Sequence, residues 1–222
     1  MSGADNASRF TRAPHAGARR IRRTPEEAER EILDAAEEYL AEHDFRDLAV
    51  DAVMARTGMV RSAFYNYFRD RNELVVRLLA RIEEEMMEAC RPWFERTGGS
   101  RDNLMAGLDA IASIYARHGP VMRAIHEASY HDNDVERHYR KLVDDFVDAV
   151  ERRLRAENRA KRTAIPDPHA VAHALLVMNT NVLVERLGTS NDRPEVVARA
   201  LRYVWLRVIY GAEVVHEGAA TR

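Results

Sequence analysis

The stretch TGMVRSAFYNYF, residues 57–68, decides how this chain folds. It contains a turn at residues 58–60 that begins with glycine, and the segment after the turn has helical spacing. Phe64 and Phe68 are four residues apart and point inward, whereas the polar side chains of this segment lie on the opposite side. Two short helices joined by such a turn, after a longer helix, are the geometry of a helix-turn-helix. The pattern therefore predicts a DNA reader in which residues 61–68 form the recognition helix.

The outward side of this predicted helix carries residue types that contact DNA. Arg61 stands at the N-terminal end, the part that enters the major groove, where a guanidinium can bond O6 and N7 of guanine. The tyrosines are expected to hold phosphates, and Arg71, in the first turn of the next helix, adds a cation beside backbone N–H groups that favour an anion. The predicted DNA-binding residues are Arg61, Ser62, Tyr65, Asn66, Tyr67 and Arg71. The alternative is an ordinary helical hairpin, which explains Phe64 and Phe68 but not this polar set.

The rest of the chain from Thr24 onward also has helical periodicity and no convincing strand pattern. Capping boxes are predicted at residues 24–27, 70–73 and 192–195, each marking a helix start. The long helix that opens at Asp70 is expected to link two domains. The expected helices are 25–43, 50–56, 61–68, 70–92, 101–118, 121–130, 134–159, 168–187 and 194–215. The prediction is an all-α protein of about nine helices, with a basic arm (1–23), a helix-turn-helix domain (24–69) and a ligand-binding and dimerisation domain (70–222).

Composition limits the classes of protein to consider. A 46% hydrophobic and 32% charged chain without an 18-residue apolar run is typical of a globular protein and predicts no membrane span. The N-terminal segment has no apolar core of the kind that a secretory signal needs, so a cytoplasmic location is expected. The net charge is −2, yet this segment contains one acid, Asp5, against six arginines: Arg9, Arg12, Arg19, Arg20, Arg22 and Arg23. It is interpreted either as a disordered tail or as an arm that reaches DNA.

The recognition segment, continued by RDRNEL at residues 69–74, resembles the DNA-binding signature of the TetR family of repressors. The resemblance implies a homodimer that places two recognition helices in successive major grooves of a palindromic double-stranded operator. The sequence departs from the common pattern at Val60, Ala63 and Ala49, where polar or capping residues are usual. A missing helix cap costs about 1 kcal/mol.

Two C-terminal segments are similar to the EthR-like branch of that family, which binds long, largely apolar ligands in a tube through the C-terminal bundle. They are LLVMN at residues 175–179, followed by Leu183, and VWLRVIYG at residues 204–211. The resemblance implies that Asn179 is a polar anchor and that Trp205 forms part of the wall. It places the ligand-binding set at Tyr115, Tyr139, Phe146, Asn179, Leu183 and Trp205. From the residues alone, Asn179 could equally bond a neighbouring helix or a dimer mate.

The last two predicted helices carry apolar residues around much of their circumference, which suits a pair that packs on its own domain and on a twin. We therefore expect a homodimer built on these helices, and a small apolar ligand that releases the operator.

Enzyme and metal interpretations find little support in the sequence. The histidines at 126, 131 and 138 lack the spacing of a zinc helix. The E-x-x-H at 213–216 is a single motif, whereas a di-iron bundle requires two such motifs and two further glutamates. Cys90 is interpreted as a small apolar residue, with an oxidation sensor as the alternative. No catalytic residue, metal or cofactor is predicted. A helical adaptor that binds another protein remains the main rival to a DNA-binding regulator.

Overall fold

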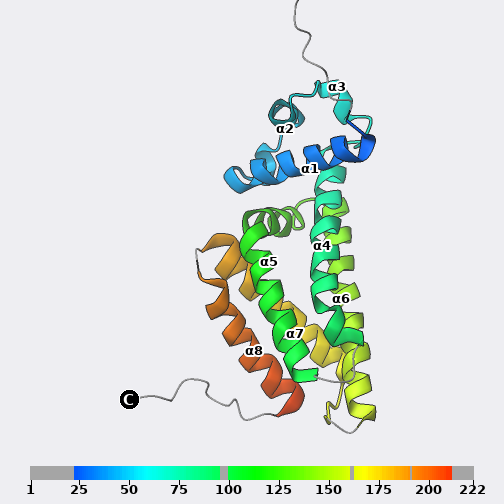
Figure 1. Ribbon diagram of the computed structural model, residues 1–222, viewed down its shortest axis with the longest axis vertical. Helices are drawn as coiled ribbons and strands as arrows, with labels where there is room; N and C mark the ends of the chain where they lie inside the picture. The colour runs from blue at the N-terminus through cyan, green and yellow to red at the C-terminus, as the bar shows by residue number, and fades with distance from the viewer. Residues whose placement is uncertain (1–22, 96–99, 161–162, 191, 212–222) are drawn as a thin grey trace, which may run out of the picture.

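The computed structural model describes residues 23–95, 100–160, 163–190 and 192–211 (Figure 1). Within these ranges the chain is helical, without strands, which confirms the all-α prediction. The α-helices are α1 (Pro25–Glu42), α2 (Val50–Thr57), α3 (Arg61–Phe64), α4 (Arg71–Glu95), α5 (Ser100–Ala128), α6 (Asn133–Arg159), α7 (Pro168–Leu183) and α8 (Pro194–Tyr210). A short 3₁₀-helix, η1 (Phe45–Asp47), precedes α2, and a π-helix, η2 (Val184–Thr189), continues α7. The predicted basic arm, apart from Arg23, lies outside the described residues.

α1 begins at the predicted capping box. The Thr24 hydroxyl accepts a hydrogen bond from the Glu27 N–H at 3.2 Å, and the Thr24 N–H donates to the Glu27 carboxylate at 2.8 Å. The inner face of α1 then follows helical spacing, with Ile32, Ala36 and Leu40 fully buried. These side chains provide the surface on which α2 and α4 pack.

The helix-turn-helix forms where predicted, but its second helix is shorter than expected. α2 ends at Gly58, whose φ of 66° is the left-handed conformation that glycine adopts without strain. α3 covers only 61–64, so the prediction of a helix over 61–68 is wrong. After Phe64 the backbone tightens, with an N–H of Tyr67 bonded to the Phe64 carbonyl at 2.9 Å. The turn still buries both phenylalanines, whose ring centroids are 5.3 Å apart.

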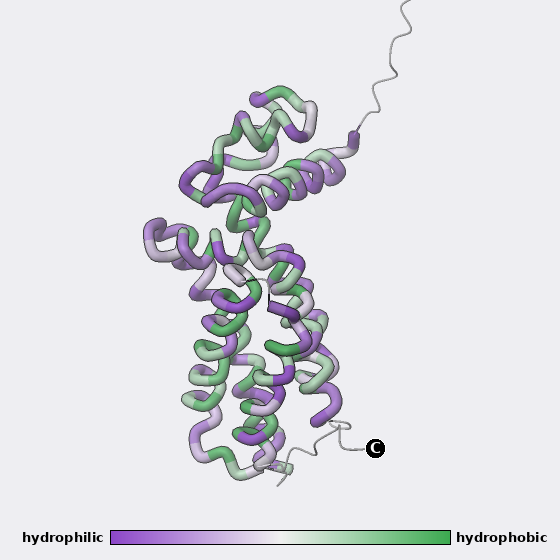
Figure 2. The backbone as a smooth tube through the Cα atoms, turned by 90° about the vertical axis from the view of Figure 1, so that its left-hand side faces the viewer, coloured by the Kyte–Doolittle hydropathy of each residue, from purple (hydrophilic) through white to green (hydrophobic). Residues whose placement is uncertain are grey.

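Below the reader, α4 runs down the molecule beside α5 and α6, and α7 and α8 complete the bundle (Figure 1). Apolar and polar residues alternate along each helix, so that each contributes one face to a shared core (Figure 2). The predicted break at Pro120 is wrong, because α5 continues to Ala128. Its last part instead turns away from the direction of its first part (Figure 1). A proline removes one backbone donor and bends a helix without ending it when packing holds both sides. The count of α-helices is therefore eight in the described residues.

The C-terminal helices also correct two predicted boundaries. α8 ends at Gly211, which has a φ of 59°, and not near residue 215. Its start is not a capping box: Arg193 is the N-cap and makes no side-chain cap bond. The Asp192 carboxylate pairs with Arg186 instead, so it does not serve the helix terminus.

α5 and η2 approach each other backbone to backbone. A Cβ added at Gly119 would lie 3.0 Å from the Leu187 carbonyl carbon and 3.2 Å from the Gly188 Cα. Only glycine fits at this point of α5, directly before the kink. We call this contact between Gly119 and residues 187–188 the glycine joint.

His118, the residue before the glycine joint, connects the bundle to the reader. Its ring nitrogens face two carboxylates: Nδ1 bonds Glu37 of α1, and Nε2 lies 3.3 Å from Glu85 of α4. Arg81 also pairs with Glu37, and Arg117 with Glu85. The bond from Glu37 raises the pKa of His118 above its usual value despite partial burial. Burial would raise the pKa of Glu37, but its bonds with His118 and Arg81 bring that pKa below normal.

This junction predicts a pH-dependent stability. A raised imidazole pKa stabilises the fold fully below the unfolded value of about 6.5, and this contribution is lost as pH rises through the folded value. The stability difference between the native chain and His118→Gln should thus be largest near pH 6 and smaller near pH 8.5. Urea unfolding at the two pH values measures it. His173→Gln, on the exposed surface of α7, is the control substitution of the same residue type. An equal cost of His118→Gln at both pH values would contradict the charged pairing.

Candidate DNA interface and ligand cavity

The surface of the helix-turn-helix presents four of the six predicted DNA-binding residues together. Arg61, Ser62, Tyr65 and Asn66 are all exposed, with Tyr65 at 52%. Arg61 is held in place from both sides of the motif. It donates to the Asp51 carboxylate of α2 at 2.8 Å and to the Tyr65 hydroxyl at 3.4 Å. This exposed ion pair is weak enough for the guanidinium to exchange Asp51 for a base edge.

The other two predicted residues lie differently. Tyr67 is half-buried and packs against the core. Arg71 donates to the carbonyls of Arg46 at 3.3 Å and Leu48 at 3.4 Å, and its guanidinium lies 5.4 Å from the Phe45 ring centroid. Arg71 thus ties η1 to α4 while remaining exposed, and its contact with DNA stays a prediction.

Val60 is a surface residue that sequence reasoning treated only as a missing cap. It is 65% exposed in the turn, directly before Arg61. An exposed branched apolar side chain at the start of a recognition helix can contact the methyl group of thymine. In the sequence, only the position of Val60 directly before Arg61 pointed to such a contact with DNA.

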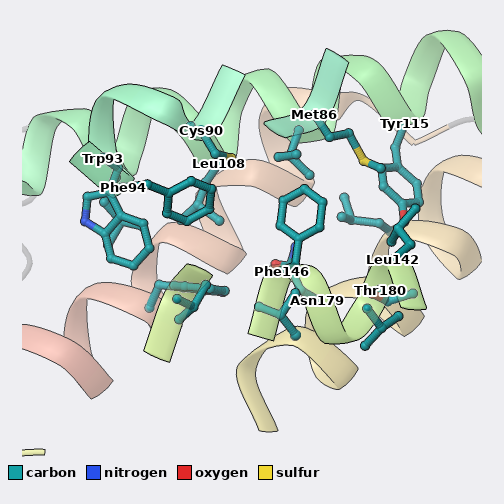
Figure 3. A pocket seen from close by; sticks show the side chains of 18 residues that line it. Met86, Cys90, Trp93, Phe94, Leu108, Tyr115, Leu142, Phe146, Asn179 and Thr180 are labelled. Carbon is teal, nitrogen blue, oxygen red and sulfur yellow. The ribbon is translucent and has the colours of Figure 1, made fainter. Parts of the chain in front are cut away.

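A cavity of about 60 Å³ lies in the C-terminal bundle. Its wall is almost entirely apolar and draws on α4, α5, α6, α7 and α8. Figure 3 shows Trp93 and Phe94 at one end, Phe146 in the middle, and Tyr115 and Thr180 at the other end. The wall also includes Met86, Cys90, Gly107 and Leu183. A site this small holds a few water molecules, whereas a benzene-sized cavity needs about 150 Å³.

Five of the six residues predicted to bind a ligand line this cavity: Tyr115, Phe146, Asn179, Leu183 and Trp205. Tyr139 is not part of the wall. Its hydroxyl is 2.9 Å from Nδ1 of His126, and burial raises its pKa. Tyr139 therefore belongs to a small polar cluster with His126 and Tyr130, whose hydroxyl is 3.3 Å from the other ring nitrogen.

The few polar atoms of the wall are unevenly satisfied. Tyr115, whose pKa is raised by burial, bonds Thr180 across the cavity. In contrast, Asn179 Oδ1 and Trp205 Nε1 are buried and have no hydrogen-bond partner among the described residues. Asn179 is 8% exposed and Trp205 is 3% exposed. A buried donor and a buried acceptor in the same wall are costly in the free protein and suit a ligand that supplies both partners.

The α4 side of the wall was missed by sequence reasoning. Met86 and Cys90 lie within the predicted helix 70–92, where Cys90 was interpreted as a small apolar residue, and Trp93 and Phe94 lie beyond its predicted end. An apolar stripe looks the same whether it meets a neighbour or a hollow, so only the continuation of the stripe past Pro92 was a usable signal. Burial raises the pKa of Cys90 to about 12, so it is a protonated thiol and a poor oxidation sensor.

The histidines considered as metal ligands are dispersed. His131 contacts Arg46 at 3.4 Å, and His138 Nδ1 is 2.7 Å from the Asp134 carbonyl. In the ranges that the structure covers, no group of three or more His, Cys, Asp or Glu could hold a metal ion. The E-x-x-H at 213–216 lies outside those ranges. Among the described residues, no helix is both long enough and apolar enough to cross a membrane.

Comparison with known proteins gives two family matches. Residues 32–78 match the family described as bacterial regulatory proteins, tetR family, and residues 104–211 match the C-terminal domain of transcriptional regulator EthR. The HTH-type transcriptional regulator EthR of Mycobacterium tuberculosis is 26% identical over 200 residues, 88% of this chain and 93% of that protein. The HTH-type transcriptional repressor Rv1474c of the same species is 28% identical over 175 residues, 79% of this chain and 89% of that protein.

Solved structures show the same fold at low sequence identity. A TetR-family regulator from Syntrophomonas wolfei superposes with a TM-score of 0.74 at 12% identity, covering 87% of this chain and all of that one. The arrangement of a small reader above a helical bundle is thus a known architecture.

Proposed function

Because the chain belongs to the TetR family of transcription regulators, with a C-terminal domain of the EthR type, we propose that it is a repressor released from operator DNA by a small, largely apolar ligand. It is a DNA-binding regulator and not an enzyme. Repression is supported by the name of the relative Rv1474c. We place its activity in the cytoplasm, the compartment that holds bacterial DNA.

The observation that carries DNA binding is the exposed group of Arg61, Ser62, Tyr65 and Asn66 at the recognition turn. We propose that Arg61 reads a guanine while the neighbouring polar side chains contact phosphates or base edges, and that Tyr67 and Arg71 support them through the fold. We propose that the helix-turn-helix domain ends and the C-terminal domain begins near residue 69, which makes α4 the connection between the two.

A mobility shift with DNA from upstream of the chain's own gene tests this function. Binding should weaken steeply as salt rises, because phosphate contacts release counterions. If the protein shows no binding at low salt, the adaptor function should replace this proposal.

We propose that the protein acts as a homodimer through α7 and α8. Four large apolar side chains are exposed on these helices, at 41 to 51%: Val177, Val196, Tyr203 and Val208. Large exposed apolar side chains on neighbouring helices are candidates for an interface. A two-fold pair would place two readers for a palindrome, with half-sites about 34–36 Å apart. Sedimentation equilibrium should give twice the mass of 25.4 kDa, and Tyr203→Arg should give the monomer mass.

The chemistry of the cavity limits the ligand. Its wall, as described, contains no acidic or basic side chain, so a buried charge would lack a partner. The ligand is therefore neutral where it is buried, with a polar group that can bond Asn179 and Trp205. Because the cavity is so small, binding must move wall side chains, and a ligand that favours the widened form shifts the reader away from its DNA-binding state.

Asn179→Leu separates the stability of the free protein from ligand binding. Leucine has a similar volume and removes the unpartnered Oδ1, so the free protein should gain about 1–3 kcal/mol in its free energy of unfolding. A ligand that bonds Asn179 should lose affinity, while operator affinity stays unchanged. Urea unfolding and operator titration measure the two effects. A destabilised Asn179→Leu protein would show that the amide is satisfied in the native state.

A further inference from the structure

Phe94 is shared between the cavity and a hollow on the outer surface. The hollow, which we call the outer groove, lies between α4 and α6, has a volume of about 460 Å³ and is lined by Glu84, Met87, Glu88, Arg91, Phe94, Glu95, Ala149 and Arg152. Two further hollows, one between α4 and α5 and one beside η1, share no residue with the cavity wall. Phe94 is thus the lining residue that the cavity and the outer groove have in common.

The Phe94 ring lies toward the end of the cavity where Trp93 lies (Figure 3). Its centroid is 5.6 Å from that of Trp93 and 6.4 Å from that of Phe146, in tilted and edge-to-face contacts. Phe94 is only partly buried, unlike Phe146, which is 7% exposed. The ring therefore has one side on the cavity and the other toward solvent.

The backbone that carries Phe94 has one intrahelical bond fewer than a regular helix, and its Pro92 carbonyl accepts instead from the Asn103 side chain at 3.3 Å. Phe94 is two positions after Pro92, which has no N–H to donate to the Glu88 carbonyl, and α4 ends one residue later at Glu95. Carbonyls in a last helical turn also lack intrahelical partners. Local opening is cheapest in such segments. The turn can thus move while the upper part of α4 keeps its contacts with the reader.

The outer groove suits the passage of an apolar molecule with a polar end. Its floor is apolar, formed by Met87, Phe94 and Ala149, and continues the character of the cavity wall. Its rim is charged, with three glutamates and two arginines. An apolar ring or chain can lie on the floor while a polar group stays hydrated at the rim.

We propose that Phe94 is the gate of the cavity, and that the ligand passes from the outer groove between α4 and α6 with its apolar part first. The groove is occupied by the same ligand only while it enters or leaves, with its polar end at the rim. This inference depends on the proposed ligand-binding function. Because a barrier on the route of access acts on entering and leaving molecules alike, groove residues should control both rates and not the affinity.

Stopped-flow binding of the neutral dye N-phenyl-1-naphthylamine to the full chain tests the gate, since this dye fluoresces in apolar surroundings. Met87→Trp fills the groove without altering the cavity wall, so kon and koff should both fall by about tenfold or more with Kd within about twofold. Phe94→Ala should raise both rates. Ala110→Trp, in the hollow between α4 and α5, is the matched control and should leave both rates unchanged.

The failures of this test are distinguishable. Rates that do not respond to Met87→Trp, or that respond equally to Ala110→Trp, overturn the gate while leaving the cavity proposal intact. Gly107→Leu, which fills the cavity, should abolish the signal, and dye binding that survives it shows another site and overturns the gate. Absence of saturable binding by the native chain overturns both proposals. Thermal unfolding of each variant confirms that it is folded.

Discussion

Arg61→Ala should weaken binding to the specific operator by about 1–3 kcal/mol per half-site, or about 2–6 kcal/mol for a dimer. That range corresponds to a loss of affinity of roughly thirtyfold to twenty-thousandfold. The reason is the position of Arg61 at the start of the recognition turn, exposed and aligned by Asp51 and Tyr65. Its removal should cost the fold little, because the ion pair that it makes is exposed.

Titration of native and Arg61→Ala protein with an operator and with a scrambled duplex measures the effect. The scrambled duplex should lose much less affinity than the operator, because only base contacts discriminate between sequences. Asp51→Asn is a useful companion, since it loosens the alignment of Arg61 and removes a negative charge near the phosphates. An equal loss on both duplexes would show that Arg61 binds phosphate and reads no base.

Gly119→Ala should destabilise the protein by about 1–3 kcal/mol, although alanine usually favours a helix over glycine. The new Cβ would lie inside van der Waals contact of the Leu187 carbonyl oxygen, which is backbone and cannot rotate away. α5 and η2 would have to separate, and the wall residues of α7 would move with η2.

Gly107→Ala in the same helix is the matched control. There the nearest atom to the new Cβ is Cys90 Sγ at 3.5 Å, an ordinary contact, so the substitution should stabilise by about 0.5–1 kcal/mol. Urea unfolding compares the two variants directly. Equal stability changes of the same sign would show that α5 and η2 can separate at the glycine joint without a cost in stability.

The sequence predicts helix existence well and helix length poorly in this protein. The capping box at Thr24 and the left-handed Gly58 are local signals, and the structure confirms both. The end of α3, the continuity of α5 through Pro120 and the start of α8 depend on tertiary partners: the burial of Phe68, packing on both sides of a kink, and the pairing of Asp192 with Arg186. No local pattern contains those partners.

The candidate sites divide in the same way. Arg61 and Tyr65 could be placed because a helical face follows from spacing alone. The contacts of Arg71 depend on where η1 lies. The contacts of Tyr139 depend on how α6 is rotated about its axis relative to α5. The role of Phe94 could not be predicted at all, because a hollow between helices leaves no mark on the apolar pattern of any one of them.

The edge-to-face contact between Trp93 and Trp205, with centroids 6.0 Å apart, gives the protein a built-in optical reporter. The chain has only two tryptophans, and both line the cavity. Any molecule that separates the two indoles, or bonds the Nε1 of Trp205, will change ultraviolet emission and near-ultraviolet dichroism. Unknown compounds can therefore be screened on the unlabelled protein, with no knowledge of the operator.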